Sequence, residues 1–312
     1  MLPAIFGLAG TTLSDAERAF FREADPAGYI LFGRNIESRE QVRALTDDLR
    51  AIHGRERLLV TIDQEGGRVQ RMKEPHWLRY PCGEVFDRLY DLAPATAIEA
   101  ARANAEALGL DLAEVGIICT HAPLLDVRQP DADNVIGDRA LGSEPLRVAA
   151  LGRAVLDGLA RAGVAGTIKH MPGHGRTSVD THKALPTVTA SDEELEWDIA
   201  PFRALSHAPI GMTGHLVFTA WDADRFRRVA ADRRPRHGGA DGNGARTGAP
   251  RHRSGLRHCA QLLGKDGRYG RDRQCAARHV RQDRAAARTG AGADPLRRSR
   301  RRSAGRADRQ AR

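Results

Sequence analysis

Short apolar runs alternate along the chain with longer stretches in which apolar residues recur every three or four positions. Runs of about four to eight apolar residues are typical of buried strands, and the longer periodic stretches are typical of amphipathic helices. Strands are therefore expected at residues 3–10, 28–32, 57–63, 115–121, 164–168 and 210–217. Because strands that alternate with helices form parallel sheets, this order predicts an α/β fold made of about six βα units.

Helices are expected between these strands, and the first two begin at a serine that can act as an N-cap. Ser14 opens a helix that runs to about residue 24, and Ser38 opens the next. An N-cap serine accepts a hydrogen bond from an otherwise unpaired backbone amide, and this fixes where a helix begins. The second helix has apolar residues at helical spacing, namely Val42, Leu45 and Leu49. Later helices are expected over residues 93–112, 144–162 and 193–205.

The pattern stops near residue 226, where the composition changes abruptly. Residues 1–226 hold 24 Lys and Arg against 33 Asp and Glu, whereas residues 227–312 hold 25 Lys and Arg against 7 Asp and no Glu. The second part has no Ile, Phe, Trp or Met, and its Val and Leu together number six. So few apolar side chains cannot offset the entropy of ordering a chain. We therefore divide the protein into a folded domain, residues 1–225, and an Arg/Gly/Ala-rich tail, residues 226–312.

Three explanations of the tail stay open. An Arg-rich segment can bind nucleic acid, and a segment poor in apolar residues can be intrinsically disordered. The third explanation is a GC-rich gene read in the wrong frame, because Arg, Ala, Gly and His dominate the tail and only one Lys occurs in it. We favour the frameshift, since the change is abrupt and falls where a barrel would still need two strands. Nucleic-acid binding is the least favoured of the three.

The rest of the composition bears on the compartment. The four cysteines lack CxxC spacing, which suits a reducing environment. The N-terminus has no basic segment, and no apolar run approaches the roughly 18–20 residues that span a bilayer. We expect a soluble cytoplasmic protein without a membrane partner.

Titratable side chains gather directly after the fifth expected strand. They are Lys169, His170, His174, Asp180 and His182. In α/β barrels the loops after the carboxyl ends of the strands form the active site. Glycoside hydrolysis needs a proton donor to the leaving oxygen, and His182 fits this role, with Asp180 close enough to orient it and tune its pKa. Lys169 and His170 would then hydrogen-bond sugar hydroxyls.

Other candidate residues also follow expected strands. Asp63 ends the third strand and precedes Gln-Glu-Gly-Gly, where glycines let the backbone approach a ligand and a carboxylate can bind two hydroxyls. Arg71 and Arg139 can each fork to a carboxylate or a hydroxyl pair. Alternatively, Asp63 is a solvated acid in a turn, and Arg71 and Arg139 are ordinary surface residues.

Zinc is a rival use of His170 and His174, which are four residues apart. Pro172 and Gly173 between them oppose the helix that would align the two rings. We expect no metal and no cofactor, and keep a metal-dependent barrel hydrolase as an alternative.

Four motifs, in matching order, resemble the bacterial β-N-acetylhexosaminidases of glycoside hydrolase family 3. They are residues 63–71 (DQEGGRVQR), 136–139 (IGDR), 169–175 (KHMPGHG) and 180–182 (DTH). The resemblance, which covers residues 1 to about 225, implies a TIM (β/α)8-type barrel of which about six βα units are encoded. It implies a glycosidase that removes terminal N-acetylglucosamine from peptidoglycan fragments during cytoplasmic cell-wall recycling, with retention of configuration and no metal. A glycan is then the expected partner, and a monomer the expected state.

Carried over by position, the resemblance implies a set of sugar-binding residues: Asp63, Arg71, Arg139, Lys169 and His170. His182 matches the acid/base of the family, and Asp180 its partner. Met171 stands where the family usually has an aromatic residue.

One part of the family pattern is missing from this sequence. The family's nucleophile is an aspartate in a Ser/Thr-Asp-Asp-Leu motif at the end of the seventh strand, and no such motif follows Asp224. A retaining hydrolase without its nucleophile cannot form the glycosyl-enzyme intermediate. An open six-stranded barrel would also expose strand edges. We therefore expect this chain to be inactive and poorly folded. A phosphorylase variant of the same family also stays open, because a histidine acid/base tolerates an anionic acceptor.

Overall fold

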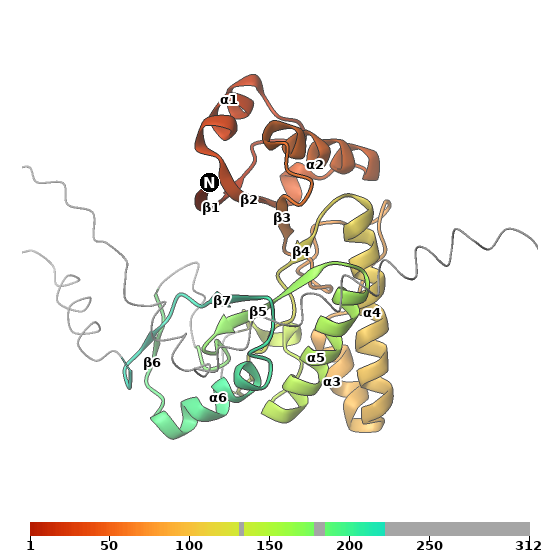
Figure 1. Ribbon diagram of the computed structural model, residues 1–312. Coiled ribbons are helices and arrows are strands. Elements are labelled where there is room, and N and C mark those ends of the chain that lie inside the picture. Colours follow the sequence, from red (N-terminus) through yellow and green to blue (C-terminus); the bar gives the residue numbers. More distant parts are fainter. Residues whose placement is uncertain (131–133, 178–184, 222–312) are drawn as a thin grey trace, which may run out of the picture. The chain divides into compact units, whose positions relative to one another are not determined.

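The structure is a computed structural model that describes residues 1–130, 134–177 and 185–221 (Figure 1). In this part of the chain six parallel strands form one sheet in the order β1-β2-β3-β4-β5-β7. Their bounds are Leu2–Gly7 (β1), Pro26–Leu31 (β2), Leu59–Ile62 (β3), Cys119–Thr120 (β4), Ala165–Met171 (β5) and Ile210–Thr213 (β7). Spatial order follows chain order, as in a (β/α) barrel, so the predicted α/β fold of about six βα units is confirmed.

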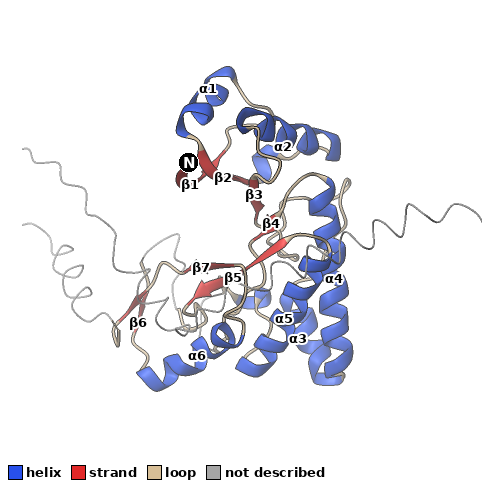
Figure 2. Cartoon of the chain, in the orientation of Figure 1, coloured by secondary structure: helices blue, strands red, loops and turns tan. Residues whose placement is uncertain are grey.

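Helices connect the strands. They are α1 (Asp15–Ala24), α2 (Arg39–His53), α3 (Gly83–Leu92), α4 (Pro94–Glu114), α5 (Pro145–Arg161) and α6 (Asp192–Ala204). Two 3₁₀ turns, η1 (Gly33–Asn35) and η2 (Gly137–Arg139), and a separate short pair, β6 (Thr187–Val188) and β8 (Val217–Phe218), complete the described elements. Figure 2 shows α3, α4 and α5 side by side, and these helices pack against one another.

Both predicted serine caps are confirmed. The Ser14 side chain accepts a hydrogen bond from the backbone N–H of Glu17, whose carboxylate accepts in return from the backbone of Ser14. The Ser38 side chain accepts from the backbone N–H of Gln41 at the start of α2. The apolar positions of α2 that share one face are buried, as expected from their spacing.

The structure differs from the expected elements in two places. Helix α3 was not predicted, because its N-cap residue, Cys82, makes no side-chain cap hydrogen bond and resembles none of the usual capping residues. The fourth strand is only two residues long. Its ladder nevertheless extends on both sides, since Ile118 donates to the carbonyl of Val60 and His121 donates to that of Ile62.

The strands that carry the candidate residues are buried, which fixes the direction of their side chains. Tyr29, Val60 and Ile62 are fully buried in one apolar cluster, and Ile168 packs in a second cluster with Phe202 of α6. Among the helices that the structure describes, none is both long and apolar enough to cross a membrane.

Candidate active site

The site begins where β3 and β5 end, because each strand brings a charged side chain to its carboxyl end. Asp63 directly follows β3, and Lys169 lies near the end of β5. The Nζ atom of Lys169 lies 3.4 Å from Oδ1 of Asp63 and 2.5 Å from Oε1 of Glu65. The Lys169 side chain is only 2% exposed. Two carboxylates therefore neutralise a lysine that is almost fully removed from solvent.

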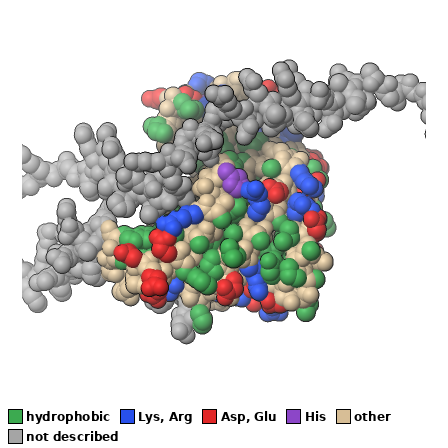
Figure 3. Space-filling view, turned by 60° about the horizontal axis from the view of Figure 1, so that its bottom comes forward, with side chains coloured by type: hydrophobic (Ala, Val, Ile, Leu, Met, Phe, Trp, Pro, Cys, Tyr) green, Lys and Arg blue, Asp and Glu red, His purple; other side chains and the backbone are tan. Residues whose placement is uncertain are grey.

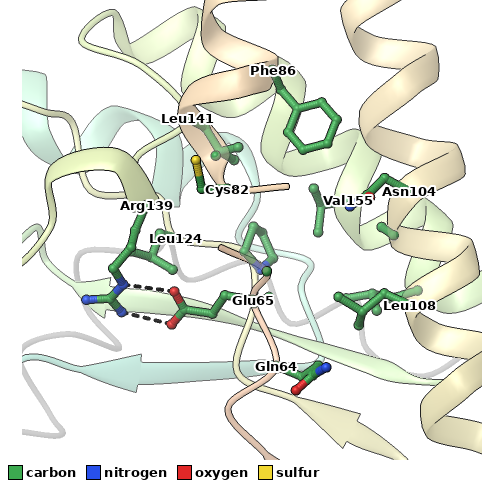
Figure 4. A pocket seen from close by; sticks show the side chains of 16 residues that line it. Gln64, Glu65, Cys82, Phe86, Asn104, Leu108, Leu124, Arg139, Leu141 and Val155 are labelled. Atoms are coloured by element: carbon green, nitrogen blue, oxygen red, sulfur yellow. Dashed lines mark hydrogen bonds and ion pairs between the residues drawn. The ribbon is translucent and has the colours of Figure 1, made fainter. Parts of the chain in front are cut away.

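A second ion pair joins Glu65 to Arg139, the last residue of η2 (Figure 4). Nε and Nη2 of Arg139 donate to the two carboxylate oxygens of Glu65, each at 2.8 Å. Nη1 of Arg139 donates to the carbonyl of Val135. This forked geometry is the strongest arginine–carboxylate arrangement, and it gives Glu65 two cationic partners inside the protein.

The loop after β3 is folded by its own glutamine and glycines. Oε1 of Gln64 accepts hydrogen bonds from the backbone of Arg71 and of Met72, which closes the loop. Gly66 and Gly67 have φ values of 98° and 57°, which only glycine adopts without strain. The motif at residues 63–71 thus returns Arg71 to the strand end, where its Nη2 lies 3.6 Å from Oδ2 of Asp63.

A buried aspartate organises the loop after β5. Asp126, whose side chain is fully buried, accepts from Nδ1 of His170 at 2.8 Å and from the backbone N–H of the same residue at 3.1 Å. It also accepts from the backbone N–H of His174 at 2.8 Å. The His174 ring hydrogen-bonds the Thr177 hydroxyl at 2.9 Å. His170 and His174 are therefore held by one carboxylate.

A third histidine, His121, follows β4 and is 7% exposed. Its Nδ1 atom is buried without a hydrogen-bond partner among the described residues. Burial lowers the pKa of His121, and the nearby cation Lys169 lowers it further, against the opposing effect of Asp63. His121 is therefore neutral near pH 7 and can offer a hydrogen bond to a ligand.

The cations of this cluster keep both of its carboxyl groups ionised. Burial alone would raise the pKa of Asp63 and of Glu65, but Lys169 and an arginine beside each carboxyl outweigh burial and hold both pKa values below the ordinary range. Both groups are thus carboxylates near neutral pH. The Asp63 side chain remains 23% exposed and that of Arg71 35% exposed. These two residues therefore offer an acceptor and a donor that a bound polar molecule can reach.

The cavity in Figure 4, about 40 Å³ in volume, adjoins the ion-pair cluster but is distinct from the exposed surface of Asp63 and Arg71. Its lining includes Glu65 and Arg139 but is otherwise mostly apolar, with Phe86, Leu108 and Leu141 among the contacts. Asp63 and Lys169 are not part of that lining. A hexose needs several hydrogen bonds, so the apolar cavity does not suit it.

The structure brings together every sequence-predicted sugar-binding residue: Asp63, Arg71, Arg139, Lys169 and His170. Asp180 and His182, the predicted acid/base pair, lie outside the described residues. Sequence reasoning did not single out Glu65, His121 and Asp126. The available signal was position, because one lies in the Gly-rich motif after β3 and the other two follow the fourth strand.

The letters of the missing nucleophile motif do occur once, at Thr46–Leu49. That segment lies inside α2, where Asp47 pairs with Arg43 and Asp48 pairs with Arg18. A strand-end nucleophile cannot be supplied by the middle of an outer helix.

Among the described residues there is also no group of three His, Cys, Asp or Glu side chains placed to hold a metal ion.

Comparisons with known proteins agree with this geometry. Residues 7–234 match the glycosyl hydrolase family 3 N-terminal domain. A beta-hexosaminidase of Alkalilimnicola ehrlichii is 40% identical over 223 residues, which cover 70% of this chain and 63% of that protein. A beta-hexosaminidase of Bordetella avium is 35% identical over 224 residues, which cover 71% and 63%. This chain thus spans about 63% of the length of these relatives.

A solved structure shows the same fold. The crystal structure of NagZ from Neisseria gonorrhoeae in complex with N-trifluoroacetyl-D-glucosamine superposes with a TM-score of 0.67 at 34% identity, covering 71% of this chain and 66% of that one. The fold of the described sheet and the match over residues 7–234 agree with one another. The chain therefore belongs to glycosyl hydrolase family 3, through the N-terminal domain of that family.

Proposed function

We propose that Asp63, Arg71, Arg139, Lys169 and His170 form the sugar site of a β-N-acetylhexosaminidase, which binds a terminal, non-reducing N-acetylglucosamine of a peptidoglycan fragment. The relatives of this chain are named beta-hexosaminidases. The NagZ of Neisseria gonorrhoeae was crystallised with an N-acylated glucosamine. Both observations support a hexosamine as the ligand of this cluster.

The observation that carries the proposal is the state of Asp63. Its carboxylate is held by Lys169 and Arg71, at 3.4 and 3.6 Å, while part of the side chain stays open to solvent. A carboxylate held in place in this way can accept hydrogen bonds from two neighbouring hydroxyls without having to reorient. Terminal sugars present such hydroxyl pairs.

For the chemical step, the family resemblance assigns proton transfer to His182 with Asp180 as its partner. A retaining mechanism also needs a nucleophile on the opposite face of the sugar. No Ser/Thr-Asp-Asp-Leu motif follows Asp224 in this sequence. We therefore expect this chain to bind the sugar and not to hydrolyse its glycosidic bond.

A calorimetric titration with N-acetylglucosamine tests the sugar site. Asp63→Asn keeps the shape of the side chain but removes its charge, and we expect the affinity to fall about 10–100-fold, the loss typical of a charged hydrogen bond. The matched control is Asp157→Asn, which removes an aspartate that is 54% exposed and pairs with Arg153 on helix α5. The control is expected to bind like the unmodified chain. Equal affinity of all three proteins would refute the assignment.

Two other functions remain as alternatives from the sequence. Metal-dependent hydrolysis predicts that a chelator abolishes activity, and nucleic-acid binding by residues 226–312 predicts binding that weakens steeply with salt. That tail lies outside the described residues. On the face in Figure 3, Lys and Arg side chains of the described part are interspersed with Asp and Glu and do not form a continuous basic surface. No specific observation favours either alternative. The cytoplasmic location and the monomeric state remain predictions.

A further inference from the structure

Asp126 lies outside every motif that the sequence analysis singled out. It follows β4 in the loop that faces β5, and its carboxylate is fully buried. Three hydrogen bonds from described residues reach it: Oδ1 accepts from the backbone N–H groups of His170 and His174, and Oδ2 lies 2.8 Å from Nδ1 of His170. One carboxylate thus connects the backbone of the β5 loop to the imidazole that ends the strand.

The protonation of this carboxylate decides which ring nitrogen of His170 carries a hydrogen. Burial opposes ionisation, but the adjacent His170 and the three hydrogen bonds outweigh burial and lower the pKa of Asp126. An ionised carboxylate only accepts hydrogen bonds. The Nδ1 atom of His170 must therefore donate, which leaves Nε2 as the ring nitrogen that points away from Asp126.

The neighbouring histidine does not compete for this role. His174 packs against the His170 ring with centroids 5.5 Å apart, but its own Nδ1 is engaged by the Thr177 hydroxyl. The His170 side chain is 18% exposed, so a ligand can reach it. Asp126 contacts no solvent and no ligand could touch it directly.

We propose that Asp126 is a positioning residue that holds His170 as the Nδ1–H tautomer, so that Nε2 accepts a hydrogen bond from a hydroxyl of the bound sugar. The inference rests on the proposed sugar site for its ligand, but the tautomer itself is a property of the ligand-free protein. Fixing a neutral imidazole through a buried carboxylate is the way proteins choose between its two nitrogens.

Nitrogen-15 NMR of the full chain under mildly alkaline conditions reads the tautomer directly, with the His170 signals assigned from a His170→Gln sample. We expect Nδ1 to be protonated and Nε2 to be bare. In Asp126→Asn the amide oxygen stays on the two backbone N–H groups, and its NH₂ group then faces Nδ1. The imidazole must switch to the Nε2–H tautomer, as happens when the aspartate of a catalytic triad is replaced by asparagine.

Asp198→Asn is the matched control. Asp198 is also a buried carboxylate beside the β5 loop, packed against Gly173, but it pairs with Arg176 and not with His170. This variant is expected to keep the Nδ1–H tautomer. A wild-type spectrum with a bare Nδ1 would overturn the proposal even if the asparagine variant did not fold. An unchanged tautomer in folded Asp126→Asn would overturn it as well.

Titration with N-acetylglucosamine separates this inference from the proposed function. If both hold, Asp126→Asn binds the sugar about tenfold more weakly, the cost of one mismatched hydrogen bond. If the tautomer switches but the wild-type chain binds no sugar, the proposed function fails and the positioning role of Asp126 stands. If the sugar binds equally to both proteins although the tautomer has switched, the role of Nε2 as the acceptor fails.

Discussion

At the residue scale, the buried charges of the site depend on one another. Glu65 is 6% exposed at its side chain and has two cationic partners, Lys169 and Arg139, which are also largely buried. Removing one member of such a cluster leaves an uncompensated charge without water to solvate it. The shared carboxylate and its two cations therefore stabilise one another as a group.

Glu65→Gln tests this dependence. We expect it to lower the free energy of unfolding by about 3–5 kcal/mol, because Lys169 and Arg139 lose their shared carboxylate. The control, Glu106→Gln, removes a carboxylate that is 39% exposed and 3.5 Å from Arg161, and should cost about 0–1 kcal/mol. Urea unfolding of the two variants gives the comparison. A cost for Glu65→Gln as small as that of the control would contradict the account.

The loss of stability in Glu65→Gln should depend on pH. The folded protein lowers the pKa of Glu65, so the stabilisation from its charge is complete above the unfolded value of about 4.3 and is lost as the pH falls below it. The difference in stability between wild type and Glu65→Gln should accordingly shrink in acid. A difference that stays constant from neutral to acid pH would show that the Glu65 charge is not the cause.

Single residues could be predicted from the sequence only where the signal is local. Asp63, Lys169 and His170 could be found from sequence because each ends an expected strand, and strand ends are where barrel enzymes carry chemistry. The partners of these residues could not be found. Asp126 lies 44 residues before His170, and Glu65 lies 74 residues before Arg139. Only the folded sheet brings such pairs together.

At the scale of elements, the loop after β5 is fixed by tight packing against the loop after β4. A Cβ atom on Gly175 would overlap the backbone carbonyl of Val127, the residue next to Asp126. Gly173 has a φ of 143°, which side chains disfavour. The glycines of the motif at residues 169–175 are therefore required by the geometry that places His170 and His174 on one carboxylate.

Gly175→Ala is expected to destabilise the protein by about 1–3 kcal/mol, because the backbone must move to admit the methyl group. It should also weaken sugar binding, since the displaced loop carries His170. Gly10→Ala is the control, because a Cβ atom there would meet no heavy atom within 4 Å. Thermal unfolding and titration of both variants provide the test, and an effect of Gly175→Ala no larger than that of Gly10→Ala would count against the packing argument.

The same loop is tied to α6 by Arg176. Its Nε atom lies 2.6 Å from Oδ2 of Asp198, and Nη1 lies 3.3 Å from Glu194. Burial raises the pKa of Asp198 to about 6 despite the opposing effect of Arg176. For a carboxyl whose folded pKa is raised, stability is greatest when it is protonated and falls as the pH rises through the folded value.

Arg176→Gln should therefore be destabilising by about 3 kcal/mol at mildly alkaline pH, where Asp198 would be an unpaired buried charge. The cost should become smaller below about pH 5, because Asp198 then binds a proton. Arg88→Gln, at a position 76% exposed and paired with Glu84 of the same helix, should cost less than about 0.5 kcal/mol at either pH. Urea unfolding at the two pH values decides, and a pH-independent cost for Arg176→Gln would contradict the role of Asp198.

Elements were predicted well where the sequence carries a local signal. The serines before α1 and α2 and the apolar runs of β2, β3 and β5 gave correct positions, because caps and buried runs act through neighbouring residues. Helix α3 and the pair β6 and β8 lack such signals. Helix α3 packs mainly against α4, and β8 pairs with a strand that lies some 30 residues earlier in the chain.

At the scale of the whole molecule, the strand order explains why one site gathers residues from four segments. Parallel strands in chain order bring the carboxyl ends of β3, β4 and β5 to the same edge. Among the described residues β1 pairs only with β2, and β7 pairs only with β5. The proposed sugar site thus lies on β3, β4 and β5, away from both of these edges.

The whole chain combines a match to the family with the lack of a nucleophile motif after Asp224. Residues 7–234 match the family, and the Arg/Gly/Ala-rich tail, residues 226–312, lacks the short apolar runs of the preceding part. We therefore propose that this chain recognises a terminal N-acetylglucosamine but does not cleave the glycosidic bond next to it.

The most direct measurement is to saturate the purified full chain with an aryl β-N-acetylglucosaminide and to quantify, in the same sample, bound intact glycoside and released aryl alcohol. The account predicts saturable binding of the intact glycoside, with release no faster than in buffer alone. Release above that rate, lost in His182→Ala, would contradict the missing nucleophile. Absence of saturable binding would contradict the sugar site itself.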